Sequence, residues 1–253
     1  VEKIAAEKPD LIKLMITGGV LDAEVVGEPG VLRMKPELVK SACDRAHQLG
    51  MQVAAHVESP EGVRVALENG VDSIEHGAKP DDEILRLFRE RHAFQVSTIS
   101  PALPYALFDR SISHATYEQQ ENGKIVFDGI VSMAKACLNA GIPVGLGTDT
   151  GCPYITHYDM WREICYFVKY CGVTPAFALY SATLLNAELS GIASRTGSIE
   201  AGKDADLIVC AKNPLDDLTA LRKLDLVIRG GYRIDHPTVK KMPEVERELD
   251  KFL

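Results

Sequence analysis

Short apolar runs alternate with amphipathic stretches over the first part of the chain. The apolar runs end in small or polar residues, which is typical of buried strands; they cover 11–16, 51–56, 71–76, 93–99 and a run that ends at Asp149. Between them, apolar positions spaced three or four residues apart predict helices at 36–49, 60–68, 81–91 and 123–140. Strands that alternate with helices in this order form parallel sheets with right-handed crossovers. The pattern therefore predicts an α/β fold.

The pattern changes after the fifth strand. Helices are predicted at 157–171 and 174–189, and short strands at 207–210 and 224–229, after a polar, turn-rich segment at 196–206. Two short strands are not stable alone, so we expect them in a small sheet with strands from elsewhere. Residues 243–253 predict an exposed final helix. Residues 100–122, with two prolines and little periodicity, predict a long loop that could include a short helix.

Composition narrows the class of protein. The 253 residues are 46% hydrophobic, which is enough for one large domain with a small appendage. A formal charge of -8 argues against a nucleic-acid or anionic-membrane partner. The six cysteines contain no CxxC pair and indicate reduced thiols, and no apolar run suits a membrane span or signal peptide. We therefore expect a cytoplasmic protein.

Four of the predicted strands carry a chemically useful side chain at or near their ends. Lys13 lies near the end of the first strand, His56 and His76 end the second and third, and Asp149 ends the fifth. Because the carboxyl ends of parallel strands share one edge of a sheet, we expect these side chains to lie together. Imidazole and carboxylate groups are good ligands for Zn²⁺ and related divalent metals. The sequence therefore predicts a metal centre at this edge.

Lys13 requires a chemical change before it can bind metal. A deprotonated lysine amine that reacts with carbon dioxide becomes a carbamate, whose two oxygens can bridge two metal ions. Lys13 lies between Ile12 and Leu14, so we expect burial to lower the pKa of its amine in the required direction. The alternative is an ordinary lysine whose amine reaches solvent.

The other candidates also have structural explanations. His56 and His76 could be hydrogen-bonded core imidazoles, and Asp149 could bond the backbone of its own turn. Four such residues at successive strand ends nevertheless favour one shared site over four separate structural roles. His157 is a candidate for substrate contact or, alternatively, for the cap of the following helix.

Several segments together resemble a known group of enzymes. They are residues 12–20, Ala55-His56, Ser73-Ile74-Glu75-His76-Gly77, Gly147-Thr148-Asp149 and the segment 197–207. In this order they resemble the amidohydrolase superfamily, and within it the prolidase-like, imidazolonepropionase-related branch. The resemblance covers about residues 9 to 231. It implies a (β/α)8 TIM-type barrel, of which this chain carries strands 4 to 8 with their helices, and part of a small β-sandwich.

The resemblance also implies roles for single residues. Lys13 would be the carboxylated lysine that bridges two Zn²⁺ ions, and His56 and His76 would be ligands of one of them. Asp149 would bind the other ion and transfer protons. The implied reaction is hydrolysis of a small amide or dipeptide, including N-acylated amino acids, by a hydroxide that bridges the metals. Association into a homo-oligomer is compatible with the sequence.

The resemblance also implies domain boundaries, and the sequence differs from the family pattern at two places. We expect part of the barrel at 1–190, part of the sandwich at 191–235 and a helical tail at 236–253. The His-x-His motif of the family's first strand is absent, so we expect roughly the first third of the fold to be missing, truncated or supplied as a separate chain. Glu58 follows Val57 where several prolidase-like members carry another His, which weakens the analogy with their substrates.

Three other functions remain alternatives. A deaminase or cyclic-amide hydrolase of the same superfamily would use one metal without Lys13. An aldolase would use Lys13 to form a Schiff base with a carbonyl substrate. A catalytically incomplete fragment or binding module would bind metal or ligand without turnover. The sequence identifies neither the substrate side chains nor the metal.

Overall fold

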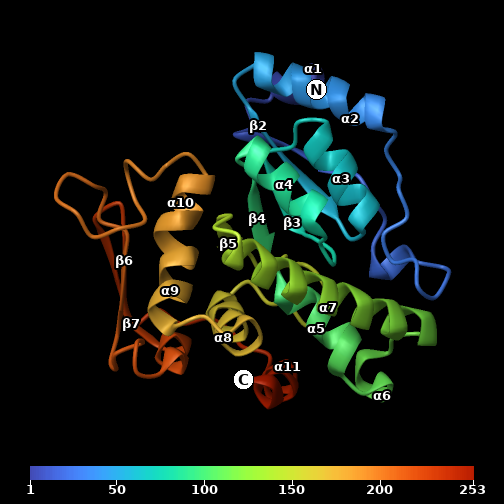
Figure 1. The fold of residues 1–253 in the computed structure, drawn as a ribbon. Helices are drawn as coiled ribbons and strands as arrows, with labels where there is room; N and C mark the ends of the chain where they lie inside the picture. The colour runs from blue at the N-terminus through green and yellow to red at the C-terminus, as the bar shows by residue number, and fades with distance from the viewer. The chain divides into compact units, whose positions relative to one another are not determined.

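The computed structural model describes residues 1–253, which form two compact units, Val1–Val144 and Gly145–Leu253. The boundary falls inside strand β5 (Val144–Leu146), so the first unit holds the long alternation of strands and helices seen in Figure 1. No helix combines the length and the apolar composition that a membrane crossing requires. The domain boundaries expected at residues 190 and 235 stay predictions.

The larger sheet has the predicted α/β organisation. Its strands follow one another in chain order: β1 (Leu11–Met15), β2 (Gln52–Val57), β3 (Ser73–His76), β4 (Phe94–Ser97) and β5. Strands β1 to β4 pair in parallel, and the register aligns Met15 with His56 and Val57 with His76. Each predicted strand is present, with bounds that differ from the prediction by a few residues. The alternation of strand and helix is therefore confirmed.

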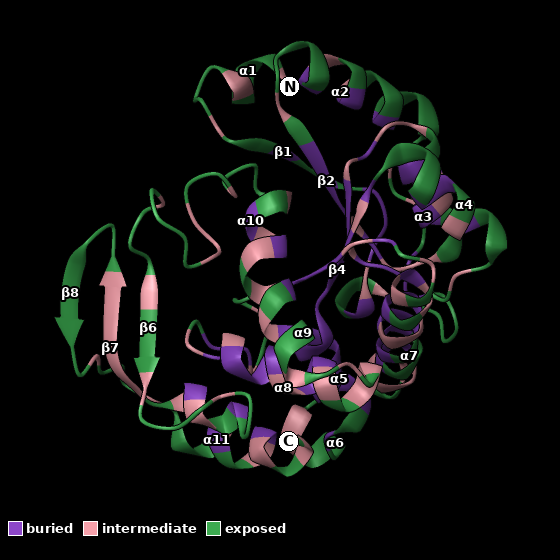
Figure 2. Ribbon diagram, turned by 60° about the vertical axis from the view of Figure 1, so that its left-hand side comes forward, coloured by how far each residue is buried: buried purple, intermediate pink, exposed green.

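Short sequence signals start the helices that cover this sheet. Helices α2 (Pro36–Gln48) and α3 (Pro60–Glu68) begin with proline, whose fixed φ suits a first turn. Helix α4 (Asp82–Arg91) is capped by Asp81, which accepts a hydrogen bond of 3.0 Å from the backbone N–H of Ile84. A short helix, α1 (Glu2–Ala5), precedes the first strand. Figure 2 marks the buried residues of α2, α3 and α4, whereas α1 has none.

The segment predicted as a long loop is largely helical. It contains α5 (Ile99–Leu107), α6 (Arg110–Ser113) and the start of α7 (Tyr117–Asn139). Pro101 lies in the first turn of α5, where its missing N–H costs nothing, and the buried side chains of α5 pack on α7. At the start of α7, Thr116 and Gln119 cap each other through bonds of 3.0 and 3.1 Å. The two prolines argue against a helix in the sequence, but burial against α7 keeps this segment helical.

The predicted burial of Lys13 is wrong. Ile12 and Leu14 are buried at 2% and 9% exposure, whereas Lys13 and its same-face neighbours on β1, Leu11 and Met15, are exposed. Successive side chains of a strand point to opposite faces, so apolar neighbours in sequence say nothing about the face of Lys13.

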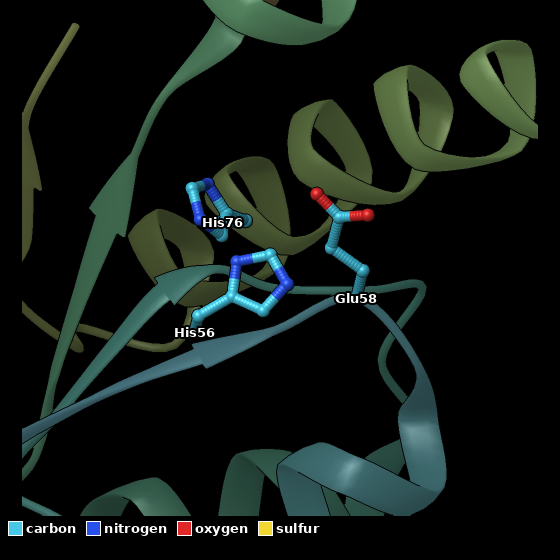
Figure 3. A group of neighbouring side chains, drawn as sticks. All are labelled: His56, Glu58 and His76. Atoms are coloured by element: carbon cyan, nitrogen blue, oxygen red, sulfur yellow. The ribbon is translucent and has the colours of Figure 1, made fainter. Parts of the chain in front are cut away.

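The ends of β2 and β3 place two imidazoles side by side. His56 is the fifth residue of β2 and His76 the last of β3. Figure 3 shows both rings, with the side chain of Glu58 beside them. The two histidines therefore lie at the carboxyl edge of the sheet, as the sequence predicted.

The second unit contains helices and a small antiparallel sheet. Helix α8 (Met160–Cys171) is followed by a continuous helical stretch: α9 (Pro175–Tyr180), a π-helical turn η2 (Ser181–Leu185) and α10 (Asn186–Leu189). Strands β6 (Leu207–Cys210) and β7 (Leu224–Arg229) match the prediction. The next strand, β8 (Tyr232–Asp235), was missed. Gly230 and Gly231 both have positive φ and join β7 to β8 in a tight hairpin, so the third strand comes from the same segment.

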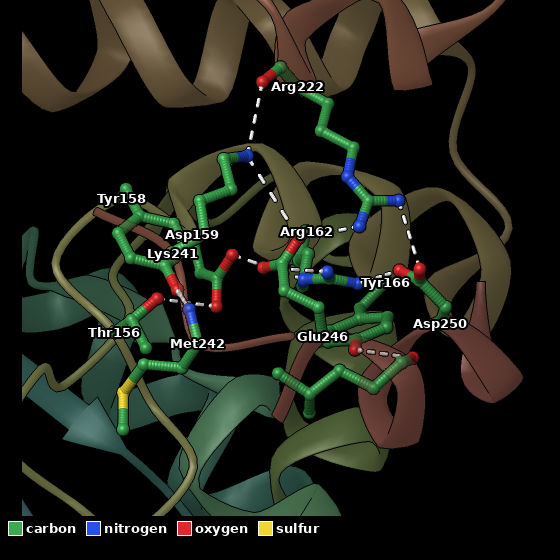
Figure 4. A network of polar contacts seen from close by, with 11 residues as sticks. Thr156, Tyr158, Asp159, Arg162, Tyr166, Arg222, Lys241, Met242, Glu246 and Asp250 are labelled. Carbon is green, nitrogen blue, oxygen red and sulfur yellow. Dashed lines mark hydrogen bonds and ion pairs between the residues drawn. The ribbon is translucent and has the colours of Figure 1, made fainter. Parts of the chain in front are cut away.

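The C-terminal helix is anchored by a buried arginine. Helix α11 (Pro243–Leu249) was predicted to be exposed, but Glu246 and Leu249 are buried. The Arg162 side chain, 1% exposed, forms ion pairs of 3.1 Å with both Asp159 and Glu246 and a further pair with Asp250 (Figure 4). A charge this deeply buried is tolerated only when it is paired and hydrogen-bonded.

A second arginine shares the same acids. Arg222, at the end of the 3-10 helix η3 (Leu218–Arg222), pairs with Glu246 and Asp250. Both guanidinium groups also lie over the indole ring of Trp161, at 4.4 Å for Arg162 and 5.3 Å for Arg222. Three separate segments of the second unit are thus tied together by charge.

Removing Arg162 should destabilise the second unit strongly. In Arg162→Ala the buried Glu246 loses one of its cationic partners, and we expect the free energy of unfolding to fall by about 3–5 kcal/mol. The matched control is Arg195→Ala, because Arg195 makes an exposed pair with Asp204 and its loss should cost less than about 1 kcal/mol. Urea unfolding followed by fluorescence measures both; equal losses would contradict a structural role for the cluster.

The same cluster predicts an acid limit to stability. Burial alone would raise the pKa of Glu246 and Asp250, but hydrogen bonds from Arg162 and Arg222 outweigh burial and hold both pKa values below their ordinary range. The stability they contribute is therefore present above the unfolded-state pKa and is lost as pH falls through the folded-state pKa. Unfolding measured between about pH 5 and pH 3 should show a shallower pH slope in Glu246→Gln than in the wild type. An unchanged slope would show that Glu246 does not contribute to the loss of stability in acid.

Candidate metal centre

Three side chains from the ends of two neighbouring strands form a compact group. The ligand atoms of His56, Glu58 and His76 all lie within 4.8 Å of one another. The centroids of the two imidazole rings are 4.7 Å apart and the rings meet edge to face (Figure 3). Two imidazoles and a carboxylate at this spacing make a donor set suited to a divalent metal.

The backbone at His76 makes this approach of the rings possible. In a regular strand, His76 would point to the same face as its register partner Val57, away from the face of His56. His76 instead has φ of 68°, a left-handed conformation that a non-glycine residue rarely adopts. Gly77 continues the turn with φ of 93°. Strained backbone of this kind persists where the surrounding structure fixes it, commonly at functional sites.

Neighbouring groups hold His76 in place. Its Nδ1 lies 2.6 Å from Oγ1 of Thr98, and its backbone carbonyl accepts a 3.0 Å hydrogen bond from the side chain of Gln95. With Nδ1 committed to Thr98, Nε2 is the nitrogen suited to a metal. Burial, together with the charges of His56 and Lys13, holds the pKa of His76 well below its ordinary value. The ring is therefore neutral at neutral pH, as a metal ligand must be.

His56 is oriented by the loop after β1. Its Nε2 lies 3.2 Å from the backbone carbonyl of Gly18, which orients the ring and leaves Nδ1 as the ligand atom of this arrangement. Both histidines thus have one nitrogen engaged with a second group. This pattern is typical of metal-binding imidazoles.

Glu58, which follows β2, is hydrogen-bonded to the same loop. Its Oε2 accepts a 3.1 Å hydrogen bond from the backbone N–H of Val20, and its own N–H donates to Oγ1 of Thr17 at 3.0 Å. A Cβ on Gly19 would lie 2.9 Å from the Glu58 carboxylate and 3.4 Å from the His56 ring. The loop therefore passes closer to these side chains than a larger residue would allow.

Lys13 lies on the same face of the sheet as His56. It pairs in register with Ala54, two residues before His56, and its charge contributes to the lowered pKa of His76. Its side chain is exposed. The structure therefore brings Lys13 into electrostatic range of the histidine group, while its chemical state stays a prediction.

Asp149 belongs to the second unit. It follows β5, has φ of 50° and is exposed, and Oδ2 accepts a 3.4 Å hydrogen bond from Sγ of Cys152. His157 is exposed and stacks edge to face on Tyr158. The expected cap role of His157 is wrong, because Asp159 occupies the N-cap position of α8. The predicted roles of Asp149 and His157 towards metal and substrate stay predictions.

Sequence reasoning missed several residues of this group. Thr98 comes directly after β4, in a position like those of His56 and His76 in their strands. A search for polar residues at the ends of strands would therefore have found it. Glu58 was noted only as a departure from a family pattern. Gln95, buried within β4, carries no sequence signal, because its contact depends on the unusual backbone of His76.

A groove adjoins the group inside the first unit. It has a volume of about 590 Å³ and is bordered by Glu58, the glycine-containing loop 27–32, Lys79 and two apolar residues of α7, Ile125 and Val126. This volume suits a small molecule. The groove joins an apolar wall to charged groups of both signs.

Comparisons with known proteins identify relatives of this chain. The chain is 29% identical over 235 residues to the ochratoxinase of Aspergillus niger; the match covers 90% of this chain and 47% of that protein. Among solved structures, a Bifidobacterium longum protein assigned as a prolidase has a TM-score of 0.93 and 40% identity, covering 99% of this chain and 62% of its own. A Xaa-Pro dipeptidase with methionine in its active site has a TM-score of 0.83 and 33% identity, covering 93% of this chain and 57% of its own.

The chain therefore spans about half the length of the curated relative and about six tenths of the solved ones. The sequence model of the amidohydrolase family matches residues 1–234, which is nearly the whole chain. Together with the parallel sheet and the histidine pair at its strand ends, this match shows that the chain belongs to the amidohydrolase family.

Proposed function

We propose that this chain belongs to a metal-dependent hydrolase that cleaves amide bonds. The observation that carries the proposal is the packing of two imidazoles and a carboxylate within 4.8 Å at adjacent strand ends. The lowered pKa of His76 supports it, because a neutral imidazole offers a lone pair to metal. Membership in the amidohydrolase family supports the reaction class.

In this proposal His56, His76 and Lys13 bind metal, and Asp149 transfers protons. His56 and His76 would hold Zn²⁺ or a similar ion, which lowers the pKa of water and polarises a substrate carbonyl when bound. Lys13, as a carbamate, would add a bridging ligand for a second ion. Asp149 would accept a proton from the attacking water and deliver it to the leaving nitrogen. Thr98 and Gly18 keep the two imidazoles oriented during these steps.

We propose a dipeptide or N-acylated amino acid as substrate. The support is the likeness to a Xaa-Pro dipeptidase and to ochratoxinase, and the size of the groove next to Glu58. The likeness to a dipeptidase and the size of the groove favour a small substrate over a protein. Residues of the loop 27–32 and of α7 that line this groove would then influence which side chain is accepted.

Two substitutions separate metal binding from proton transfer. In protein loaded with Zn²⁺, Asp149→Asn should lower kcat for a cleaved amide by about 10²–10⁴-fold while most of the metal stays bound, since the proton acceptor is lost. His76→Asn should instead release metal, because a buried ligand is removed. Metal content is measured by atomic emission and turnover by release of free amine. The control is Asp128→Asn, an exposed acid on α7; full turnover in Asp149→Asn would refute the role.

Carboxylation of Lys13 has its own test. Incubation with ¹³C-labelled bicarbonate should give a carbamate signal in the ¹³C NMR spectrum of the wild type and none in Lys13→Arg, because arginine keeps the charge but cannot form the carbamate. The metal-to-protein ratio should also fall in the variant. Wild-type metal content and turnover in Lys13→Arg would favour a one-metal hydrolase. Trapping of a carbonyl substrate on Lys13 by borohydride would favour an aldolase.

A further inference from the structure

We propose that Glu58 is a third protein ligand of the metal ion held by His56 and His76. This inference rests on the proposed function, because it assigns a ligand within the same centre. It also gives a role to Glu58, which the sequence analysis noted only as a residue that stands where several prolidase-like members carry a histidine and that weakens the analogy with their substrates. A carboxylate can take the place of an imidazole as a ligand of Zn²⁺ and of related divalent ions.

The distances are compatible with one ion bound by all three groups. Nitrogen and oxygen ligands lie roughly 2.0–2.2 Å from Zn²⁺, which places two ligand atoms of one ion about 3.3–3.6 Å apart in a tetrahedral site. The ligand atoms of His56, Glu58 and His76 lie within 4.8 Å of one another. A spacing of at most 4.8 Å is close to these values, so small adjustments shared by the three side chains would let them bind one ion.

The surroundings of Glu58 argue against an ordinary solvated acid. Its carboxylate accepts a hydrogen bond from Val20, and its backbone N–H is held by Thr17. A Cβ at Gly30 would lie only 2.4 Å from the Glu58 carbonyl carbon, so a second loop also closes on this residue. Ligand carboxylates are commonly fixed by such outer hydrogen bonds, which hold them in the binding geometry.

An acidic residue at this position would also supply negative charge to the metal ion. His56 and His76 are neutral donors when they bind a metal, so the protein supplies little negative charge to a divalent ion through them alone. Glu58 would supply one unit of charge within reach of both rings.

The test is a metal titration of matched variants. Glu58→Gln keeps an oxygen that can accept the Val20 N–H but removes the anionic ligand, and we expect it to weaken Zn²⁺ binding by more than about 100-fold. The control, Glu61→Gln, changes an acid in the first turn of α3 that is not part of the group, and should bind as the wild type does. Affinity is measured by competition with a chromophoric chelator. The visible spectrum of the Co²⁺ form, which depends on the ligand set, should change in Glu58→Gln only.

A second variant displaces the carboxylate without removing it. Gly19→Ala adds a Cβ 2.9 Å from Oε2 of Glu58, at a backbone φ of -144° that alanine adopts without strain. We expect this variant to unfold at a similar denaturant concentration and to bind Zn²⁺ about 10–100-fold more weakly. It keeps the proposal open to refutation if Glu58→Gln does not fold.

The outcomes separate this inference from the proposed function. Weak binding in Glu58→Gln, Gly19→Ala and His76→Asn, with wild-type binding in Glu61→Gln, supports both. Weak binding in His76→Asn alone overturns the role of Glu58 and leaves the metal centre intact. Binding that none of the four substitutions weakens overturns the metal centre and the role of Glu58 together.

Discussion

The candidate centre depends on one local constraint, the left-handed backbone at His76. A regular strand would send His76 to the face of Val57, and the two imidazoles would be separated by the sheet. The turn formed by His76 and Gly77 brings the rings to a centroid distance of 4.7 Å. Its strain is balanced by contacts from the neighbouring strand, where Gln95 binds the His76 carbonyl and Thr98 binds its ring. The chemistry of the site therefore depends on how β3 ends.

The rest of the group is arranged around that pair. The loop after β1 contacts His56 through the Gly18 carbonyl and Glu58 through the Val20 N–H, so one short loop orients two side chains of the next strand. A Cβ at position 19 would press on the Glu58 carboxylate, because the backbone there passes close to both side chains. A loop held this closely favours preorganised ligands over ligands that gather around an ion. This is why the group differs from a chance cluster of polar side chains.

The two units concentrate charge for different purposes. In the first, a carboxylate and two imidazoles lie close together at a strand edge next to a groove, which is an arrangement that can accept an ion or a small molecule. In the second, Arg162 and Arg222 are neutralised by acids from α11 and its extension, and the pairs are internal. The ionisable groups of the first unit form a candidate metal centre, whereas those of the second unit attach the C-terminal helix. The contrast shows why burial of ionisable groups alone does not identify a site.

The sequence alone determined the α/β class, the order of the strands and the positions of His56 and His76, because hydrophobic periodicity and strand-end polarity are local properties. It also placed the helix starts that carry proline. Tertiary structure decided what no local signal contains. Packing on α7 made 99–107 a helix despite its prolines, and the Gly230-Gly231 hairpin supplied the third strand of the small sheet. Strand alternation exposed Lys13 although its sequence neighbours are buried, and the reversed φ of His76, with the loop that holds Glu58, fixed which side chains meet.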